Sequence, residues 1–173
     1  MVRRRAGWRV VVVVGIIAGA GGCAATVPAR PLPFPGGGSA SAMDARLSGE
    51  LRQRVTSNAL ALRGIPYRSG GGTPTQGFDC SGFVQFVFEE SQIPVPRTVA
   101  QQYRAAHSVS SRHVEPGDLL FFSTDGPGPT HVGIVVSEDV FVHAPGSGRV
   151  VRSERFDTPY WKQHFVGARR IVP

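Results

Sequence analysis

The chain has 173 residues, which is enough for one globular domain with a hydrophobic core, because domains typically contain about 100–150 residues. The formal net charge is +7, but four arginines and no acid lie within residues 1–22, which leaves +3 for the remainder. The other basic residues are scattered and are not interleaved with aromatic residues, so we expect no nucleic-acid partner.

The first 22 residues have the pattern of an export signal. The basic segment MVRRRAGWR precedes an apolar run over residues 10–20, which is shorter than the roughly 20 residues that a membrane-spanning helix needs. Small residues then lead to Cys23, as in the bacterial lipobox, although Ala20 stands where such boxes usually carry Leu. We predict a lipoprotein signal peptide over residues 1–22 and a lipid on Cys23; the alternative is an ordinary secretory peptide.

The predicted lipid has consequences for location and for the second cysteine. Ala24 provides no inner-membrane retention signal, so we expect an outer-membrane lipoprotein that faces the periplasm. Residues 23–44 are rich in Pro, Gly and Ser and are typical of a flexible linker, which places the folded domain at residues 45–173. If Cys23 carries lipid, Cys80 has no disulfide partner.

The domain is predicted to be α+β, with helices first and strands afterwards. Apolar residues recur at threes and fours over residues 45–63, and Gly64 ends this helix. A second helix is expected at residues 80–91 with Asp79 as its N-cap, and a third after Thr98. Short apolar or alternating runs separated by turn residues then predict antiparallel strands, at residues 115–123, 130–137, 139–144, 148–154 and 164–172.

Cys80 is a candidate nucleophile because of its place at the start of a helix. The positive end of a helix dipole and its free N–H groups favour the thiolate, so we expect a lowered Cys80 pKa. The first-turn N–H groups are also suited to stabilising an oxyanion.

Two of the five histidines lie in apolar strands, and either is a candidate base. If the strands form a hairpin in which Val136 faces Val140, then Gly133 faces His143. His131 lies two residues before Gly133, so both imidazoles project from one face as diagonal neighbours. Other interpretations of Cys80, His131 and His143 are an unreactive core cysteine with packing histidines, or three ligands of a zinc ion.

Seven ordered motifs resemble those of the NlpC-type cysteine peptidases, a family of bacterial cell-wall endopeptidases. The resemblance implies a papain-like fold in which Cys80 is the nucleophile, His131 the base and His143 the residue that orients it. It also implies that Tyr67, Asp79 and Ser81 line or contact the substrate, although Asp79 is equally the predicted cap and Tyr67 can be a packing aromatic. The motifs are GIPYRSGG, GFDCSGFVQFVF, VPRTVAQQ, EPGDLLFF, HVGIVV, FVHAP and the terminal YW with GARRI.

The resemblance further implies hydrolysis of peptidoglycan stem peptides or their crosslinks, with no metal and no organic cofactor. The resemblance does not indicate which bond is cut: the bond from D-Glu to the diamino acid within one stem, or the D-Ala crosslink between stems. Two other functions stay open: a cell-wall-binding module without hydrolysis, and a cysteine-dependent acyltransferase.

Overall fold

The computed structural model describes residues 38–172, so the predicted signal peptide, Cys23 and most of the predicted linker lie outside the described residues. Helix α1 (Gly38–Ala61) begins seven residues before the predicted start. Residues 38–44, which we assigned to the linker, are therefore helical; Ala and Met among them favour a helix, and the first eight residues with described side chains are exposed. Within the described range, no helix is long and apolar enough to cross a membrane.

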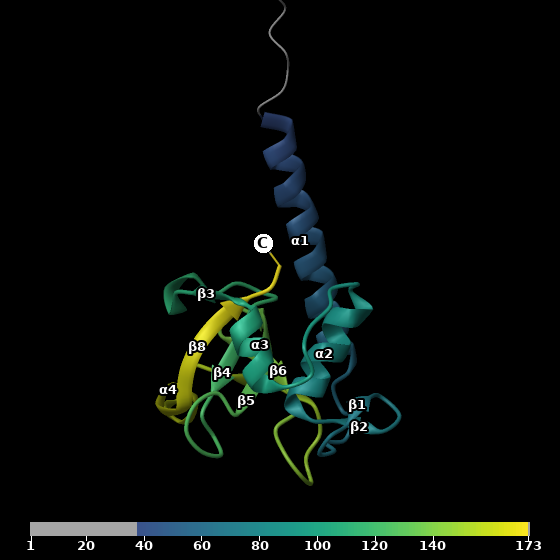
Figure 1. The fold of residues 1–173 in the computed structure, drawn as a ribbon, viewed down its shortest axis with the longest axis vertical. Helices are drawn as coiled ribbons and strands as arrows, with labels where there is room; N and C mark the ends of the chain where they lie inside the picture. Colours follow the sequence, from purple (N-terminus) through teal and green to yellow (C-terminus); the bar gives the residue numbers. More distant parts are fainter. Residues whose placement is uncertain (1–37, 173) are drawn as a thin grey trace, which may run out of the picture. The chain divides into compact units, whose positions relative to one another are not determined.

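The domain is α+β, as predicted, and is built on a six-stranded antiparallel sheet in the order β3-β8-β4-β5-β6-β7 (Figure 1). Four of these strands lie within the predicted runs, and β7 extends one residue beyond its run. The sequence did not predict β3, the hairpin of β1 and β2, the 3-10 turn η1 or helix α4. The strands are β1 (Gly72–Thr73), β2 (Gly77–Phe78), β3 (His107–Val109), β4 (Leu119–Phe122), β5 (His131–Ser137), β6 (Val140–His143), β7 (Arg152–Arg155) and β8 (Phe165–Arg170). The helical elements after α1 are α2 (Cys80–Glu90), α3 (Val99–Ala105), η1 (Ser111–His113) and α4 (Pro159–His164).

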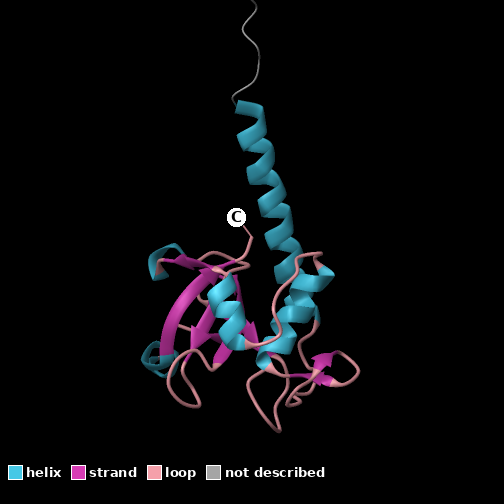
Figure 2. Ribbon diagram, in the orientation of Figure 1, coloured by secondary structure: helices cyan, strands magenta, loops and turns pink. Residues whose placement is uncertain are grey.

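The two faces of the sheet have separate cores. In β4, Leu119 and Phe121 belong to the cluster beneath α1 and α2, whereas Leu120 and Phe122 belong to a smaller cluster with Trp161 of α4. Figure 2 shows α1, α2 and α3 gathered on one side of the strands. Both clusters are buried, which is why β4 is apolar at every position and does not alternate with polar residues.

The hairpin of β5 and β6 has the predicted register toward the end that carries His131 and His143. Ile134 pairs with Val142 and Val135 with Phe141, which places Gly133 opposite His143. The predicted pair of Val136 with Val140 is wrong, because a two-residue turn leaves Val136 as a bulge and Ser137 pairs with Val140. A Cβ on Gly133 would lie 2.4 Å from the Phe141 ring, so only glycine fits this position.

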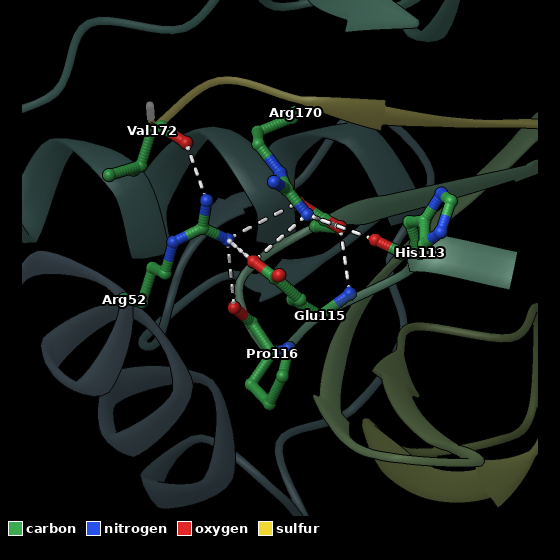
Figure 3. Close-up of polar contacts among 7 residues, drawn as sticks. Arg52, His113, Glu115, Pro116, Arg170 and Val172 are labelled. Carbon is green, nitrogen blue, oxygen red and sulfur yellow. Dashed lines mark hydrogen bonds and ion pairs between the residues drawn. The ribbon is translucent and has the colours of Figure 1, made fainter. Parts of the chain in front are cut away.

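A buried carboxylate, Asp118, joins the ends of the domain through a cluster that includes Arg52, Glu115 and Arg170, which are labelled in Figure 3. Its side chain has no exposed surface and accepts hydrogen bonds from Nε and Nη2 of Arg170, at 2.8 and 2.9 Å. Nη1 of Arg52 on α1 lies 3.5 Å from the same carboxylate, and Glu115 donates its backbone N–H to it at 2.9 Å. Arg52 also donates to the carbonyl of Val172, so one ion cluster holds α1, the turn before β4 and the end of β8 together.

We expect Asp118→Ala to lower the free energy of unfolding by about 3 kcal/mol, the usual cost of removing one partner from a buried ion pair. Urea unfolding followed by circular dichroism measures this change. Asp157→Ala removes an exposed carboxylate that pairs with Arg155, and as a control it should have a much smaller effect. Equal effects of the two substitutions would contradict the structural role of Asp118.

Candidate active site

Cys80 is the first residue of α2, and the predicted cap of this helix is confirmed. The Asp79 carboxylate accepts a hydrogen bond from the Gly82 N–H at 2.7 Å, and the Asp79 carbonyl accepts one from Phe83 at 2.9 Å. The backbone N–H groups of Val132 on β5, of Ser81 and of Cys80 itself all act to lower the pKa of the Cys80 thiol. Cys80 therefore lies against the strand residue that follows His131.

The expected lowering of the Cys80 pKa is wrong. Burial, followed by the negative charge of Asp79, raises the pKa of the thiol to about 11, although the three N–H groups around the sulfur act in the opposite direction. The helix N-terminus alone does not compensate for removing the thiolate from water. Cys80 is a neutral thiol in the resting protein and needs a base to become a nucleophile.

His131 and His143 are in direct contact, as the hairpin register predicted. Nε2 of His131 lies 2.8 Å from Nδ1 of His143, and the two rings are nearly perpendicular at 86°. Burial, and then the proximity of His143, lowers the pKa of His131 to about 3. His131 is thus neutral at physiological pH, and its Nδ1 makes no hydrogen bond within residues 38–172.

His143 contacts a carboxylate that the sequence did not indicate. Its side chain is fully buried, and its Nε2 lies 3.5 Å from Oε1 of Glu154 on β7. Burial lowers the pKa of His143, whereas Glu154 raises it. The Glu154 carboxylate also accepts a hydrogen bond from Trp161 Nε1 at 2.9 Å and pairs with Arg152.

Aromatic rings enclose the histidine pair. Phe141 stacks on His143 with ring centres 4.5 Å apart, in the space that Gly133 leaves open. Trp161 stacks on His131 at 5.8 Å and meets His143 edge to face at 5.2 Å. These contacts restrict both imidazoles to one orientation.

Asp79 and Ser81, predicted to contact substrate, have a shared partner in the structure. Arg97 pairs with both Asp79 oxygens, at 2.9 and 2.7 Å, and donates to the Ser81 hydroxyl at 3.0 Å. The pKa of Asp79 is lowered by Arg97 and by the N–H groups of Gly82 and Gly70, despite its burial. These contacts give both residues a role in supporting the start of α2.

Tyr67 is bridged to Phe78, two residues before Cys80. Burial raises the pKa of Tyr67, and the neighbouring Cys80, Asp79 and Asp125 raise it further. The backbone N–H of Tyr67 donates to the carbonyl of Arg149 at 2.8 Å, which joins the segment before β1 to the loop before β7.

A cavity of about 770 Å³ opens on the histidine side of the site. It is lined by residues that include His131, His143, Arg149, Arg152, Glu154 and Trp161. Arg149 forms no ion pair with any of the described residues, so the cavity offers a free positive charge beside the imidazoles.

The other histidines lie away from this arrangement. His107 and His113 are exposed on β3 and η1, and His164 at the end of α4 bonds to the carbonyl of Tyr160. Across residues 38–172, no three His, Cys, Asp or Glu side chains are grouped to hold a metal ion.

Sequence reasoning missed three residues of the site: Arg97, Glu154 and Trp161. Arg97 and Trp161 lie in motifs that carried the family resemblance. The resemblance therefore pointed to these positions but did not predict what either side chain does. Glu154 had no local signal, since its contact depends on β6 pairing with β7 across a loop of eight residues.

The family of the protein follows from comparison with known sequences. The model of the NlpC/P60 family matches residues 64–170, which is well over half of the chain and includes Cys80, His131 and His143. The chain belongs to the NlpC/P60 family.

Individual relatives agree with this assignment. Murein DD-endopeptidase MepH of Escherichia coli K12 is 39% identical over 124 residues, which are 69% of this chain and 46% of that protein. Gamma-DL-glutamyl hydrolase of Bacillus subtilis 168 is 37% identical over 121 residues, which are 68% of this chain and 29% of that protein. The chain therefore spans less than half the length of either relative.

Solved structures show the same fold. A protein from Staphylococcus aureus Mu50, described as similar to a lipoprotein of the NLP/P60 family, superposes with a TM-score of 0.65 at 35% identity, over 72% of this chain and 42% of that one. The NlpC/p60 domain of the peptidoglycan hydrolase SagA superposes with a TM-score of 0.59 at 28% identity, over 68% of this chain and 97% of that one.

The lowered pKa values of the buried site predict that acid destabilises the fold. The pKa of His131 falls from 6.5 to about 3 on folding, so the unfolded chain binds the proton more tightly and stability decreases as the pH falls below about 6.5. The pKa of Glu154, lowered to about 2 mainly by His143, adds a loss of the same sign below about pH 4.5.

We therefore expect His131→Gln to flatten the pH dependence of stability between pH 6.5 and 5, where each such group contributes up to about 1.4 kcal/mol per pH unit. Urea unfolding at several pH values measures this slope. His107→Gln changes an exposed histidine and should leave the slope as in the unmodified protein. A slope that His131→Gln does not alter would contradict the neutral, buried state of His131.

Proposed function

We propose that this protein is a peptidoglycan endopeptidase that uses Cys80 as its nucleophile. The observation that carries the proposal is the arrangement of Cys80 at the N-terminus of α2 beside the strand that bears His131, with His131 bonded to His143, in a chain of the NlpC/P60 family. His131 acts as the general base and His143 orients it.

The proposed reaction uses only groups of the protein and water. Nδ1 of His131 takes the proton of the Cys80 thiol as the sulfur attacks an amide carbonyl of the peptide. The N–H groups of Cys80 and Ser81 stabilise the resulting oxyanion. The His131 imidazolium then protonates the leaving amine, the C–N bond breaks and a thioester forms. Water, deprotonated by His131, attacks the thioester and releases the acid and the thiol.

Peptidoglycan is proposed as substrate from the relatives and from the charge of the cavity. Curated relatives with 37–39% identity are named murein DD-endopeptidases, and another is a bifunctional muramidase/DL-endopeptidase. Arg149 and Arg152 in the cavity suit the carboxylates of peptidoglycan stem peptides. Both bond types therefore remain candidates: D-Glu to the diamino acid, and the D-Ala crosslink.

We expect the unmodified protein to release new muropeptides from purified sacculi, and Cys80→Ala to release none. Cys80→Ser should be nearly inactive, because a hydroxyl is a far weaker acid than a thiol at the same position. Mass spectrometry of the soluble products measures release and identifies the bond that is cut. Substantial release by Cys80→Ala would exclude the mechanism.

The same experiment separates the two alternative functions. A binding module would sediment with sacculi without releasing any peptide, and an acyltransferase would attach the acyl group to an added amine in preference to water. Soluble hydrolysis products that require Cys80 support the endopeptidase over both.

We further propose that Cys23 is lipid-modified and that the domain faces the periplasm from the outer membrane. The support is the basic, apolar and small-residue pattern of residues 1–23, together with Ala24 after the cysteine. The proposal rests on sequence alone, because these residues lie outside the described range.

Cys23→Ala should abolish labelling with radioactive palmitate and move the protein from the detergent phase to the aqueous phase, since two or more acyl chains give stable anchoring. Activity on sacculi in solution should persist, which separates anchoring from catalysis. Unmodified protein that partitions into the aqueous phase without lipid would show that the chain is simply secreted.

A further inference from the structure

Nε2 of His143 is buried and has no hydrogen-bond partner of normal length within residues 38–172. Oε1 of Glu154 lies 3.5 Å from it, a distance at which the two groups interact through charge. This pair is separate from the bond between His143 and His131, which uses Nδ1 of His143.

Glu154 is held in place by Trp161 and Arg152, which both donate to its carboxylate. Its Oε2 accepts from the indole of Trp161 at 2.9 Å, while Oε1 faces both His143 and Arg152. The pKa of Glu154 is lowered to about 2, first by His143 and also by Trp161 and Arg152, so the carboxylate is ionised. An ionised carboxylate accepts hydrogen bonds and cannot donate one.

This geometry determines where the protons of both imidazoles lie. A bare Nε2 on His143 would point a lone pair at an anion, so its proton must lie on Nε2 and its Nδ1 must accept. His131 then donates from Nε2, which leaves Nδ1 of His131 bare. A bare Nδ1 is the form of His131 that can take a proton from the thiol.

We propose that Glu154 is a positioning residue that fixes the tautomer of His143 and, through it, the tautomer in which His131 is a base. Its ionised side chain also stabilises the His131 imidazolium that forms once the thiol has lost its proton. The catalytic consequence rests on the proposed function, whereas the tautomers do not.

The tautomers are measured directly by long-range proton–nitrogen correlation spectra of the full-length protein with ¹⁵N-labelled histidine. Signals are assigned with His131→Gln and His143→Gln. We expect both histidines to carry the proton on Nε2, and Glu154→Ala to convert His143 to a mixture of the two forms. A proton on Nδ1 of His143 in the unmodified protein would overturn the proposal whatever the activity.

Kinetics on a soluble muropeptide that the unmodified protein cleaves provide the second measurement. We expect Glu154→Ala to reduce kcat roughly 10–100-fold with little change in KM, the range that loss of an orienting partner of a buried histidine costs in metal sites. Glu50→Gln removes an exposed carboxylate charge from α1, away from the site, and serves as the matched control, with unchanged kcat.

A double substitution separates tautomer control from packing. His143 faces Oε1 of Glu154 and Trp161 donates to Oε2, and the amide of Glu154→Gln has oxygen at only one of these two places. Its NH₂ group must therefore face the N–H of either His143 or Trp161. Trp161→Phe removes the second donor. We therefore expect Glu154→Gln combined with Trp161→Phe to be more active than Glu154→Gln alone.

The outcomes are distinct. Recovery in the double variant supports tautomer control, whereas additive losses, or a kcat of Glu154→Ala within twofold of the unmodified value, would overturn it. Thermal unfolding of each variant shows whether the fold is retained. Loss of the proposed function would appear instead as an unmodified protein that cleaves no muropeptide, with the tautomers still as expected.

Discussion

The domain depends on the burial of one carboxylate, Asp118, between two arginines from opposite ends of the chain. Its backbone carbonyl also accepts the N–H of Val135 at 2.9 Å, which fixes β5 against the turn before β4. The far end of β5 carries His131. A charge cluster remote from the thiol therefore contributes to the position of His131, because the strand between them is paired on both sides.

Chemistry at the site is governed by competition between burial and polar contacts. Burial raises the pKa of Cys80 and lowers that of His131, so the resting pair is a neutral thiol and a neutral imidazole. Under the proposed mechanism, the proton therefore moves from the thiol to His131 as substrate is attacked, and the groups that stabilise the imidazolium gain importance. His131, His143 and Glu154 form a line of contacts in which both imidazoles are buried and Glu154 is partly exposed, and Glu154 is ionised.

Two features of the site could be predicted from short stretches of sequence: the helix cap at Asp79 and the contact of His131 with His143. The cap at Asp79 needs only a helix start, and the contact of His131 with His143 needs only a short hairpin. The start of α1 and the short helix α4 were missed because Ala-rich residues after Gly38 and six residues after Thr158 have no clear apolar period.

Other features depend on long-range structure that no local pattern encodes. Glu154 reaches His143 only because Val142 pairs with Ser153 across the sheet. The pKa of Cys80 depends on how deeply the domain covers it, which the helix start alone does not reveal. The hairpin register predicted the contact of His131 with His143, but the charge state of the candidate site residues comes from tertiary packing.

The raised pKa of Cys80 also affects its chemical durability. Thiolates, and not thiols, react with peroxides and disulfides. With a pKa of about 11, only about one molecule in ten thousand carries the thiolate at pH 7. If the chain is exported as proposed, its single free cysteine among the described residues would thereby resist oxidative inactivation, since under the proposed mechanism the sulfur loses its proton as a peptide is attacked.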